Sequence, residues 1–154
     1  MEIAVLDAQS LAKRRAEMSA ILVSCVKAGA SVGFMADIDT AKARAFWAAT
    51  IDQVHAGGHV VLVAHEGERI SGTVHLVHKM PENQPHRAEV KKLLVDPAAR
   101  RRGTGRALMV ALEAHARELG KTLLTLDTAR GSAAERLYRA LGYTQAGVIP
   151  GYAL

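Results

Sequence analysis

The 154-residue sequence predicts one α+β domain, residues 1–154, built on a single mixed β-sheet with helices on its faces. Two apolar segments, 59–65 and 70–78, flank the short turn Glu66-Gly67-Glu68-Arg69, which is typical of an antiparallel hairpin. Segment 89–127 has the pattern strand, helix, strand and is long enough for a right-handed crossover between parallel strands. No repeat or Gly-, Pro- or Ser-rich linker divides the chain.

The N-terminal part predicts one strand and two helices. Ile3–Leu6 is a short strand, and Asp7 or Ser10 can cap a helix that runs to about Lys27. Gly29–Gly33 is rich in turn residues and separates this helix from a second one over Thr40–His55, where apolar residues recur at spacings of three and four.

The C-terminal part alternates strands with helices. The predicted elements are a strand Glu89–Val95 that ends at Asp96-Pro97, a helix Gly103–Leu119 that ends at Gly120, a strand Leu123–Asp127, a helix Ser132–Leu141 and a last strand Tyr143–Ile149.

Composition excludes several classes of protein. A hydrophobic fraction of 49% with 23% charged residues is that of a folded globular chain. The single cysteine, Cys25, excludes a disulfide framework and multi-cysteine zinc sites, and the seven histidines have no metal-binding spacing, so no metal is expected. No apolar run approaches the ~20 residues of a membrane helix, and the N-terminus does not resemble a signal peptide. We therefore expect a cytoplasmic protein with no membrane partner.

The net charge of +5 favours an anionic partner. A nucleic acid is one candidate, but an aromatic fraction of only 4% provides few surfaces on which bases could stack. We therefore expect no nucleic-acid partner.

The segment that carries chemistry is the basic loop before the third predicted helix. Arg100, Arg101, Arg102 and Arg106 surround Gly103-Thr104-Gly105 where a strand ends and a helix begins. The first turn of a helix presents unpaired N–H groups and a positive dipole end, and glycine lets a diphosphate approach them closely. This arrangement predicts a site for a phosphorylated ligand, and the alternative is a solvated basic loop.

Two common nucleotide motifs do not fit this chain. A dinucleotide fingerprint needs a third glycine where Leu108 stands. Gly120-Lys121-Thr122 ends like a phosphate-binding loop, but His115 occupies the place of its first glycine, and the segment ends a helix instead of opening one.

Two motifs resemble the GNAT superfamily of N-acetyltransferases. Arg100-x-x-Gly103-x-Gly105, preceded by Leu93-Leu94-Val95-x-Pro97, is similar to its (Gln/Arg)-x-x-Gly-x-(Gly/Ala) motif, and Ala134-x-x-Leu137-Tyr138-x-x-x-Gly142-Tyr143 is similar to its second motif. The resemblance covers residues 59–151 and implies acetyl transfer from acetyl-CoA to an amine by direct attack in a ternary complex.

A narrower resemblance, to the tabtoxin-resistance branch, spans nearly the whole chain. It lies in Gly29–Asp37, Arg87–Leu93, Leu126–Ser132 and Pro150-Gly151-Tyr152. Members of this branch acetylate small amines, so the resemblance implies an amino-acid-like, antibiotic or toxin-like acceptor. The fold alone does not identify the acceptor, because one fold supports many substrates.

The resemblance implies a cofactor site on the strand and the loop. Leu94 and Val95 would contact the pantetheine and thioester through their backbone, with their side chains in the core. The pyrophosphate would contact Arg100, Arg101, Arg102, Gly103, Thr104, Gly105, Arg106 and Ala107, chiefly through backbone N–H groups from Arg101 to Ala107.

Three residues are candidates for catalysis. Tyr138 would protonate the departing thiolate as a general acid, and a buried tyrosine with a structural role is the alternative. Glu89 and Asp127 would hold the amine and accept its proton. Their structural alternatives are an ion pair of Glu89 with Lys91 or Arg87 and a cap by Asp127 on 128–131. Cys25 is expected to be a buried structural thiol.

The family normally has another strand after residues 150–152, whereas this chain stops at Leu154. Either the sequence is a truncated product or the last strand has been lost. The expected consequence is an unpaired edge along Tyr143–Ile149, and the stability of the fold, a homodimer and one wall of the acceptor site are left open. The alternative functions are a CoA-binding protein with weak or no activity and a basic nucleic-acid-binding module.

Overall fold

A computed structural model describes residues 1–154 and contains one five-stranded sheet in the order β1-β2-β3-β4-β5. The strands are β1 Glu2–Leu6, β2 His59–Glu66, β3 Arg69–Val77, β4 Arg87–Val95 and β5 Leu123–Thr125. Neighbouring strands are antiparallel except β4 and β5, which are parallel. The mixed sheet and the crossover predicted from the sequence are confirmed.

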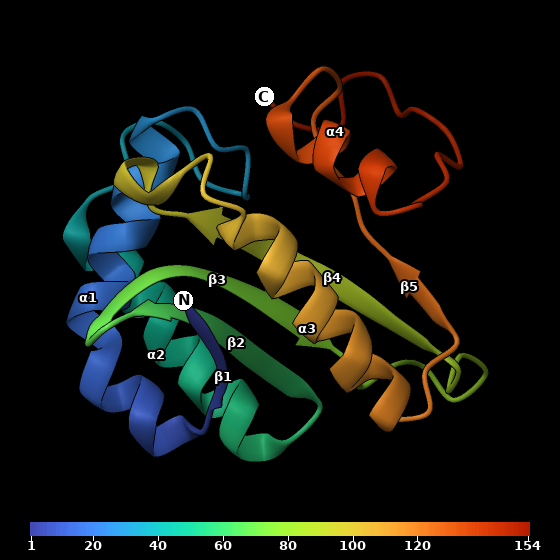
Figure 1. Ribbon diagram of the computed structural model, residues 1–154, viewed down its shortest axis with the longest axis horizontal. Helices are drawn as coiled ribbons and strands as arrows, with labels where there is room; N and C mark the ends of the chain where they lie inside the picture. Colours follow the sequence, from blue (N-terminus) through green and yellow to red (C-terminus); the bar gives the residue numbers. More distant parts are fainter.

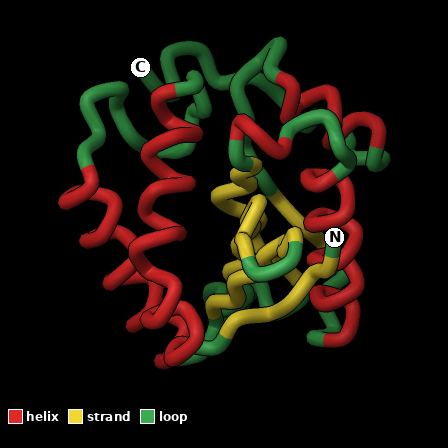
Figure 2. The backbone as a smooth tube through the Cα atoms, turned by 60° about the vertical axis from the view of Figure 1, so that its left-hand side comes forward, coloured by secondary structure: helices red, strands yellow, loops and turns green.

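Helices cover both faces of the sheet (Figures 1 and 2). They are α1 Ala8–Lys27, α2 Thr40–Ala56, α3 Thr104–Glu118 and α4 Ala133–Ala140, with a short 3-10 helix at Pro97–Ala99. One apolar core lies between α1, α2 and the sheet and includes Trp47 and Leu94. The other lies between α3, α4 and the opposite face and includes Leu108 and Tyr138. None of the helices combines the length and the apolar character that a membrane crossing needs.

The helix starts differ in how they are capped. The side chains of Asp7, Asp39 and Ser132 accept a backbone N–H in the first turn of α1, α2 and α4, respectively. Of the two caps considered for α1, Asp7 is therefore the one used, with its Oδ1 2.7 Å from the N–H of Ser10. Helix α3 begins at Gly103 and has no side-chain cap.

A bulge divides β4 at Lys92. This residue has a φ of 54°, and the register with β3 shifts between Thr73 and His75. A bulge inserts one residue into a strand, so the side chains beyond it change faces. Leu94 consequently belongs to the core under α1 and α2, on the same face as Lys91, which is opposite His75.

After Glu89, one edge of β4 has no neighbouring strand. The parallel pairing with β5 covers only Arg87–Glu89 of β4, opposite Leu123–Thr125. Figure 1 shows the two strands starting side by side and then diverging, with α4 beyond the end of β5. The backbone edge of residues 90–95 is therefore free to pair with something other than a strand of this sheet.

The predicted strand Tyr143–Ile149 is wrong, because this segment has no regular structure in the protein. The predicted strand Leu123–Asp127 ends two residues early, at Thr125. A strand needs a neighbour with which to form hydrogen bonds: β5 ends where its pairing with β4 ends, and Tyr143–Ile149 pairs with no strand. Val148 and Ile149 are exposed instead.

Candidate active site

The loop between β4 and α3 has a strongly turned backbone. Asp96 ends β4 and accepts the N–H of Ala98, and the 3-10 helix follows. Arg101 and Gly103 then adopt left-handed conformations, with φ values of 61° and 81°. Because Gly103 offers no side-chain oxygen, the first N–H groups of α3 remain available to a ligand.

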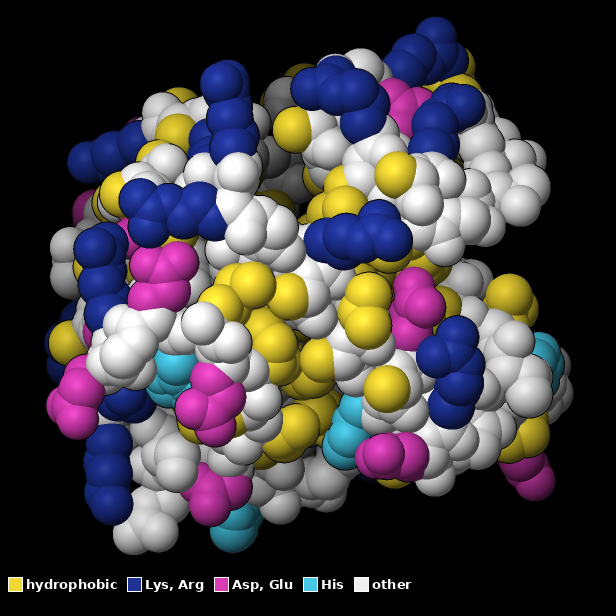
Figure 3. All heavy atoms as spheres, viewed as in Figure 1, with side chains coloured by type: hydrophobic (Ala, Val, Ile, Leu, Met, Phe, Trp, Pro, Cys, Tyr) yellow, Lys and Arg dark blue, Asp and Glu magenta, His cyan; other side chains and the backbone are white.

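Arginine side chains surround this helix start. The four arginines at positions 100, 101, 102 and 106 are all exposed. Arg102 forms an ion pair with Glu66 at 3.4 Å, and the Nε–H of Arg100 donates to the carbonyl of Val95 at 3.4 Å. Arg101 and Arg106 form no ion pair and remain free to meet an anion. Figure 3 shows Lys and Arg side chains gathered around a hollow in the upper part of the molecule, where Figure 1 places the start of α3 and α4.

Gly103, Gly105 and Thr104 each occupy their position in the motif for a different structural reason. A Cβ on Gly103 would meet no atom within 4 Å, so glycine is needed there for its left-handed backbone. A Cβ on Gly105 would lie 3.2 Å from Leu137 Cδ2, so glycine there allows α3 to approach α4. The side chain of Thr104 is buried, which leaves only its backbone N–H for a ligand.

The backbone of Val95 is held in place from two sides. Its carbonyl accepts the Sγ–H of Cys25 at 3.3 Å as well as the Nε–H of Arg100. Burial raises the pKa of the Cys25 thiol, which therefore stays protonated and can donate. Cys25 is buried, as expected, and ties α1 to the end of β4.

Tyr138 lies on α4 in the core that faces the divergence of β4 and β5. Its residue exposure is 7%, and its ring is 5.7 Å from that of Tyr143. Burial, and to a smaller extent the charge of Asp127, raises the pKa of Tyr138 to about 12. The hydroxyl therefore carries its proton at neutral pH, as a general acid must.

Asp127 and Glu89 both lie near the place where β4 and β5 diverge. Asp127 is exposed two residues beyond β5, and its charge acts on the pKa of both Tyr138 and Lys92. Thr125, at the end of β5, is paired with Glu89. The charge of Asp127 thus reaches both Tyr138 and Lys92 at the bulge of β4, and Glu89 is paired with Thr125, two residues before Asp127.

The structural alternatives for the two acids have different outcomes. Glu89 does form an ion pair with Lys91, at 3.0 Å, while Arg87 binds Gln84 and Thr125 instead. The segment 128–131 is held without Asp127, since Glu135 accepts the N–H of Gly131.

The sequence pattern did not predict the contact between half-buried His59 and buried His75. His59 Nε2 lies 3.1 Å from His75 Nδ1, and His75 is fully buried beside Phe46 and Trp47. Burial lowers the pKa of His75 well below 6.5, and the charges of His59 and Lys92 add to this effect. The signal was present in the hairpin, because pairing across the predicted turn brings His59 and His75 to neighbouring strands.

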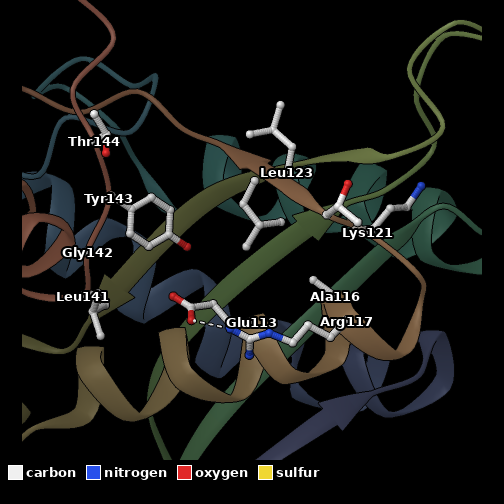
Figure 4. Close-up of a pocket in the computed structure, with 11 residues that line it drawn as sticks. Glu113, Ala116, Arg117, Lys121, Leu123, Leu141, Gly142, Tyr143 and Thr144 are labelled. Carbon is white, nitrogen blue, oxygen red and sulfur yellow. Dashed lines mark ion pairs between the residues drawn. The ribbon is translucent and has the colours of Figure 1, made fainter.

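A second hollow, of about 390 Å³, lies between α3, β5 and the segment after α4 (Figure 4). Its lining includes the ion pair Glu113–Arg117, at 3.6 Å, and Tyr143, whose hydroxyl points toward Glu113. Burial and Glu113 raise the pKa of Tyr143, so this hydroxyl is protonated. None of the predicted site residues lines this hollow.

The comparisons with known proteins identify the class. The model of the acetyltransferase (GNAT) family matches residues 29–143, and the chain belongs to this family. The match includes β4, the arginine loop, α3 and α4. The acetyltransferase fold and family implied by the sequence resemblance are therefore confirmed.

Solved structures agree with this assignment. The putative acetyltransferase yncA from Salmonella typhimurium, solved with its cofactor acetyl-CoA, is 25% identical with a TM-score of 0.73, over 98% of this chain and 87% of that one. A GCN5-related N-acetyltransferase from Ralstonia eutropha JMP134 is 22% identical with a TM-score of 0.69, over 96% and 95% of the two chains. An aminoglycoside acetyltransferase from an uncultured soil metagenomic sample, in complex with sisomicin, is 17% identical with a TM-score of 0.74, over 99% and 95%.

Gly103→Val is expected to raise the dissociation constant for CoA about 10-fold, because a left-handed backbone costs a branched side chain about 1–2 kcal/mol. The matched control is Gly120→Val at the other end of α3, where φ is 73° and a Cβ also meets no atom within 4 Å. Both variants should lose similar stability in calorimetry, whereas only Gly103→Val should weaken CoA binding in a titration. Equal CoA affinities in the two variants would contradict the assignment of this loop.

Acid is expected to destabilise the protein through His75. Because its pKa is lowered in the folded state, the unfolded chain binds the additional proton, and stability falls as the pH drops below about 6.5. One such histidine lowers the free energy of unfolding by up to about 1.4 kcal/mol per pH unit. His75→Phe should flatten this dependence in denaturant titrations between about pH 7.5 and about pH 5.5. The exposed His55 provides the matched control His55→Phe, which should keep the wild-type slope.

Proposed function

We propose that this protein, as one domain spanning residues 1–154, transfers the acetyl group of acetyl-CoA to the amine of a small molecule. Acetyl-CoA is the co-substrate of this family member, and the observation that carries the proposal is the uncapped start of α3 beside the free edge of β4. Free N–H groups, two unpaired arginines and a glycine at φ 81° suit a pyrophosphate. The free edge of residues 90–95 suits an extended pantetheine with amide groups, held by the backbone of Leu94 and Val95.

The proposed reaction is direct attack in a ternary complex. The acceptor loses a proton to Glu89 or Asp127, and its nitrogen then bonds to the thioester carbonyl carbon. The backbone N–H groups of β4 stabilise the negative oxygen that forms. As the carbon–sulfur bond breaks, the sulfur takes the proton of the Tyr138 hydroxyl, and the tyrosinate takes the second proton of the nitrogen, which leaves an amide, free CoA and the original hydroxyl.

The acceptor class follows from the resemblance to the tabtoxin-resistance branch. We propose an amino-acid-like, antibiotic or toxin-like amine as the acceptor. The structural likeness to an aminoglycoside acetyltransferase supports a small amine in general, since at 17% identity it concerns the fold alone.

The proposal is tested by ligand binding and turnover together. Free CoA at millimolar concentration should raise the melting temperature, because a ligand that binds only the folded state stabilises it. Acetylation of amino acids, polyamines, aminoglycosides and amine-bearing toxins should release CoA thiol for at least one acceptor. The absence of any thermal shift would contradict the cofactor site.

A CoA-binding protein with weak or no activity is the second candidate, and the irregular chain after α4 favours it. It predicts the same thermal shift with no release of CoA thiol for any acceptor. Turnover therefore distinguishes the two candidates.

A further inference from the structure

A pocket of about 500 Å³ lies between the end of α2 and strands β2, β3 and β4. Its lining includes Phe46, His59, His75, Lys79, Lys91 and Lys92, and it contains none of the residues assigned above to the cofactor or to proton transfer. The pocket lies on the α1 and α2 face of the sheet, since Phe46 belongs to α2 and His75 packs against it at 6.1 Å.

The lining of this pocket is cationic. It contains three lysines and no carboxylate. Glu89 contacts the ammonium of Lys91 from outside the lining, at 3.0 Å. Burial lowers the pKa values of both His59 and Lys92, and the positive charge of Lys91 adds a smaller lowering to each. A pocket of this charge attracts an anion and repels a cation.

Buried polar groups in and beside this pocket have no partner in the protein. His75 lines the pocket and is fully buried, and its Nε2 makes no hydrogen bond, nor does the Nε1 of the adjacent Trp47. Leaving such a group unpaired destabilises the folded state, so native proteins retain it where a ligand, a water or a function uses it.

The bulge of β4 connects this pocket to the reaction. Glu89 and Lys91 are two residues apart on the same face of β4, which separates them by about 7 Å along the strand. The bulge then places Lys92 on this face too, where its ammonium lies 5.6 Å from the ring centroids of Phe34 and Phe46. An acceptor whose amine meets Glu89 can therefore direct an anionic group toward Lys91 and the pocket.

We infer that this pocket binds the carboxylate of the acceptor, so that the preferred acceptor is a zwitterion of amino-acid size. This inference rests on the proposed acetyl transfer and narrows its substrate class. The ion pair of Glu89 with Lys91 presents one negative and one positive group side by side, which matches the charges of such a ligand. The ammonium of the ligand can bind Glu89 in place of Lys91, and the carboxylate of the ligand can then bind Lys91. Three lysines oppose a polycation such as an aminoglycoside at the same place.

The first experiment compares each common amino acid with its primary amide as acetyl acceptors. The amide keeps the amine and the side chain and removes the negative charge. We expect the best acceptor to be an amino acid whose kcat/KM exceeds that of its amide by about 10-fold, the lower range for a partly exposed charge-assisted contact. Amides, polyamines or aminoglycosides that react as well as the amino acids would overturn the inference.

Variants separate carboxylate binding from intrinsic amine reactivity. Lys91→Met should raise KM for the amino acid about 10-fold and leave KM for its amide unchanged. A parallel change in kcat for both acceptors would show that Lys91 acts through Glu89 and would overturn its role in binding the carboxylate. The matched control is Lys13→Met, on the exposed side of α1, which should change neither constant.

A binding measurement keeps the test independent of turnover. N-acetyl-leucine, added to the CoA-loaded protein, should shift the imidazole NMR signals of His59 and His75, and Lys91→Met should abolish the shift. The absence of a shift in the wild-type protein, with N-acetylated forms of the best acceptors included, would overturn the inference. A thermal shift with CoA and equal turnover of acids and amides would contradict only the carboxylate pocket. No thermal shift and no turnover would contradict the proposed function itself.

Discussion

Glu89→Gln is expected to slow acetyl transfer about 100-fold, the lower range for the loss of a general base. Glutamine keeps the size of the side chain and removes both the charge and the ability to accept a proton. CoA affinity should hardly change, because Glu89 pairs with Lys91 on the α1 and α2 face and does not contact the α3 loop. Steady-state kinetics beside a CoA titration provide the measurement.

Asp127→Asn is the matched comparison, since it makes the same chemical change at the other candidate acid. The larger fall in kcat identifies the base. If both variants acetylate a good acceptor at the parent rate, neither acid accepts the proton, and the proposed roles of both are wrong.

Tyr138→Phe is expected to slow the chemical step about 10–100-fold, or ~1.4–2.8 kcal/mol of barrier. The phenol has a pKa of about 12 and so holds its proton through the working pH range. A thiolate is a fairly good leaving group, which is why the expected effect is at the low end for a general acid. Phenylalanine preserves the packing against Tyr143, so the fold and CoA binding should be retained.

The measurement is single-turnover kinetics at several pH values, together with a CoA titration. An unchanged rate with chemistry rate-limiting would make Tyr138 a structural residue of the α4 core. A loss of CoA affinity that matches the loss of rate would make it a binding residue instead.

Sequence predicted the features that local chemistry determines. Ser132 caps α4 and Gly103 opens α3 because a hydroxyl and a left-handed glycine act within their own turn. The β2–β3 hairpin follows from its short turn and its apolar strands. The motif residues Gly103 and Gly105 lie at the start of α3 and Tyr138 lies on α4, although Gly105 is required by contact with Leu137 rather than by a ligand.

The features that were not predicted depend on distant partners. Tyr143–Ile149 has the composition of a strand but no neighbour at the outer edge of β5. The contact between His59 and His75 depends on a register that a bulge near Ala64 shifts by one residue. The left-handed backbone at Lys92 has no local signal, since lysine rarely adopts it, and this residue lines the cationic pocket.

The glycine at the start of α3 lowers the stability of the protein and keeps a binding site open. A serine or aspartate in its place would hold the helix and stabilise the protein by about 1 kcal/mol, as the caps of the other helices do. The same side chain would compete with the pyrophosphate for the same N–H groups. By leaving them free, the protein gives up the stability of a side-chain cap and keeps these N–H groups available to the pyrophosphate.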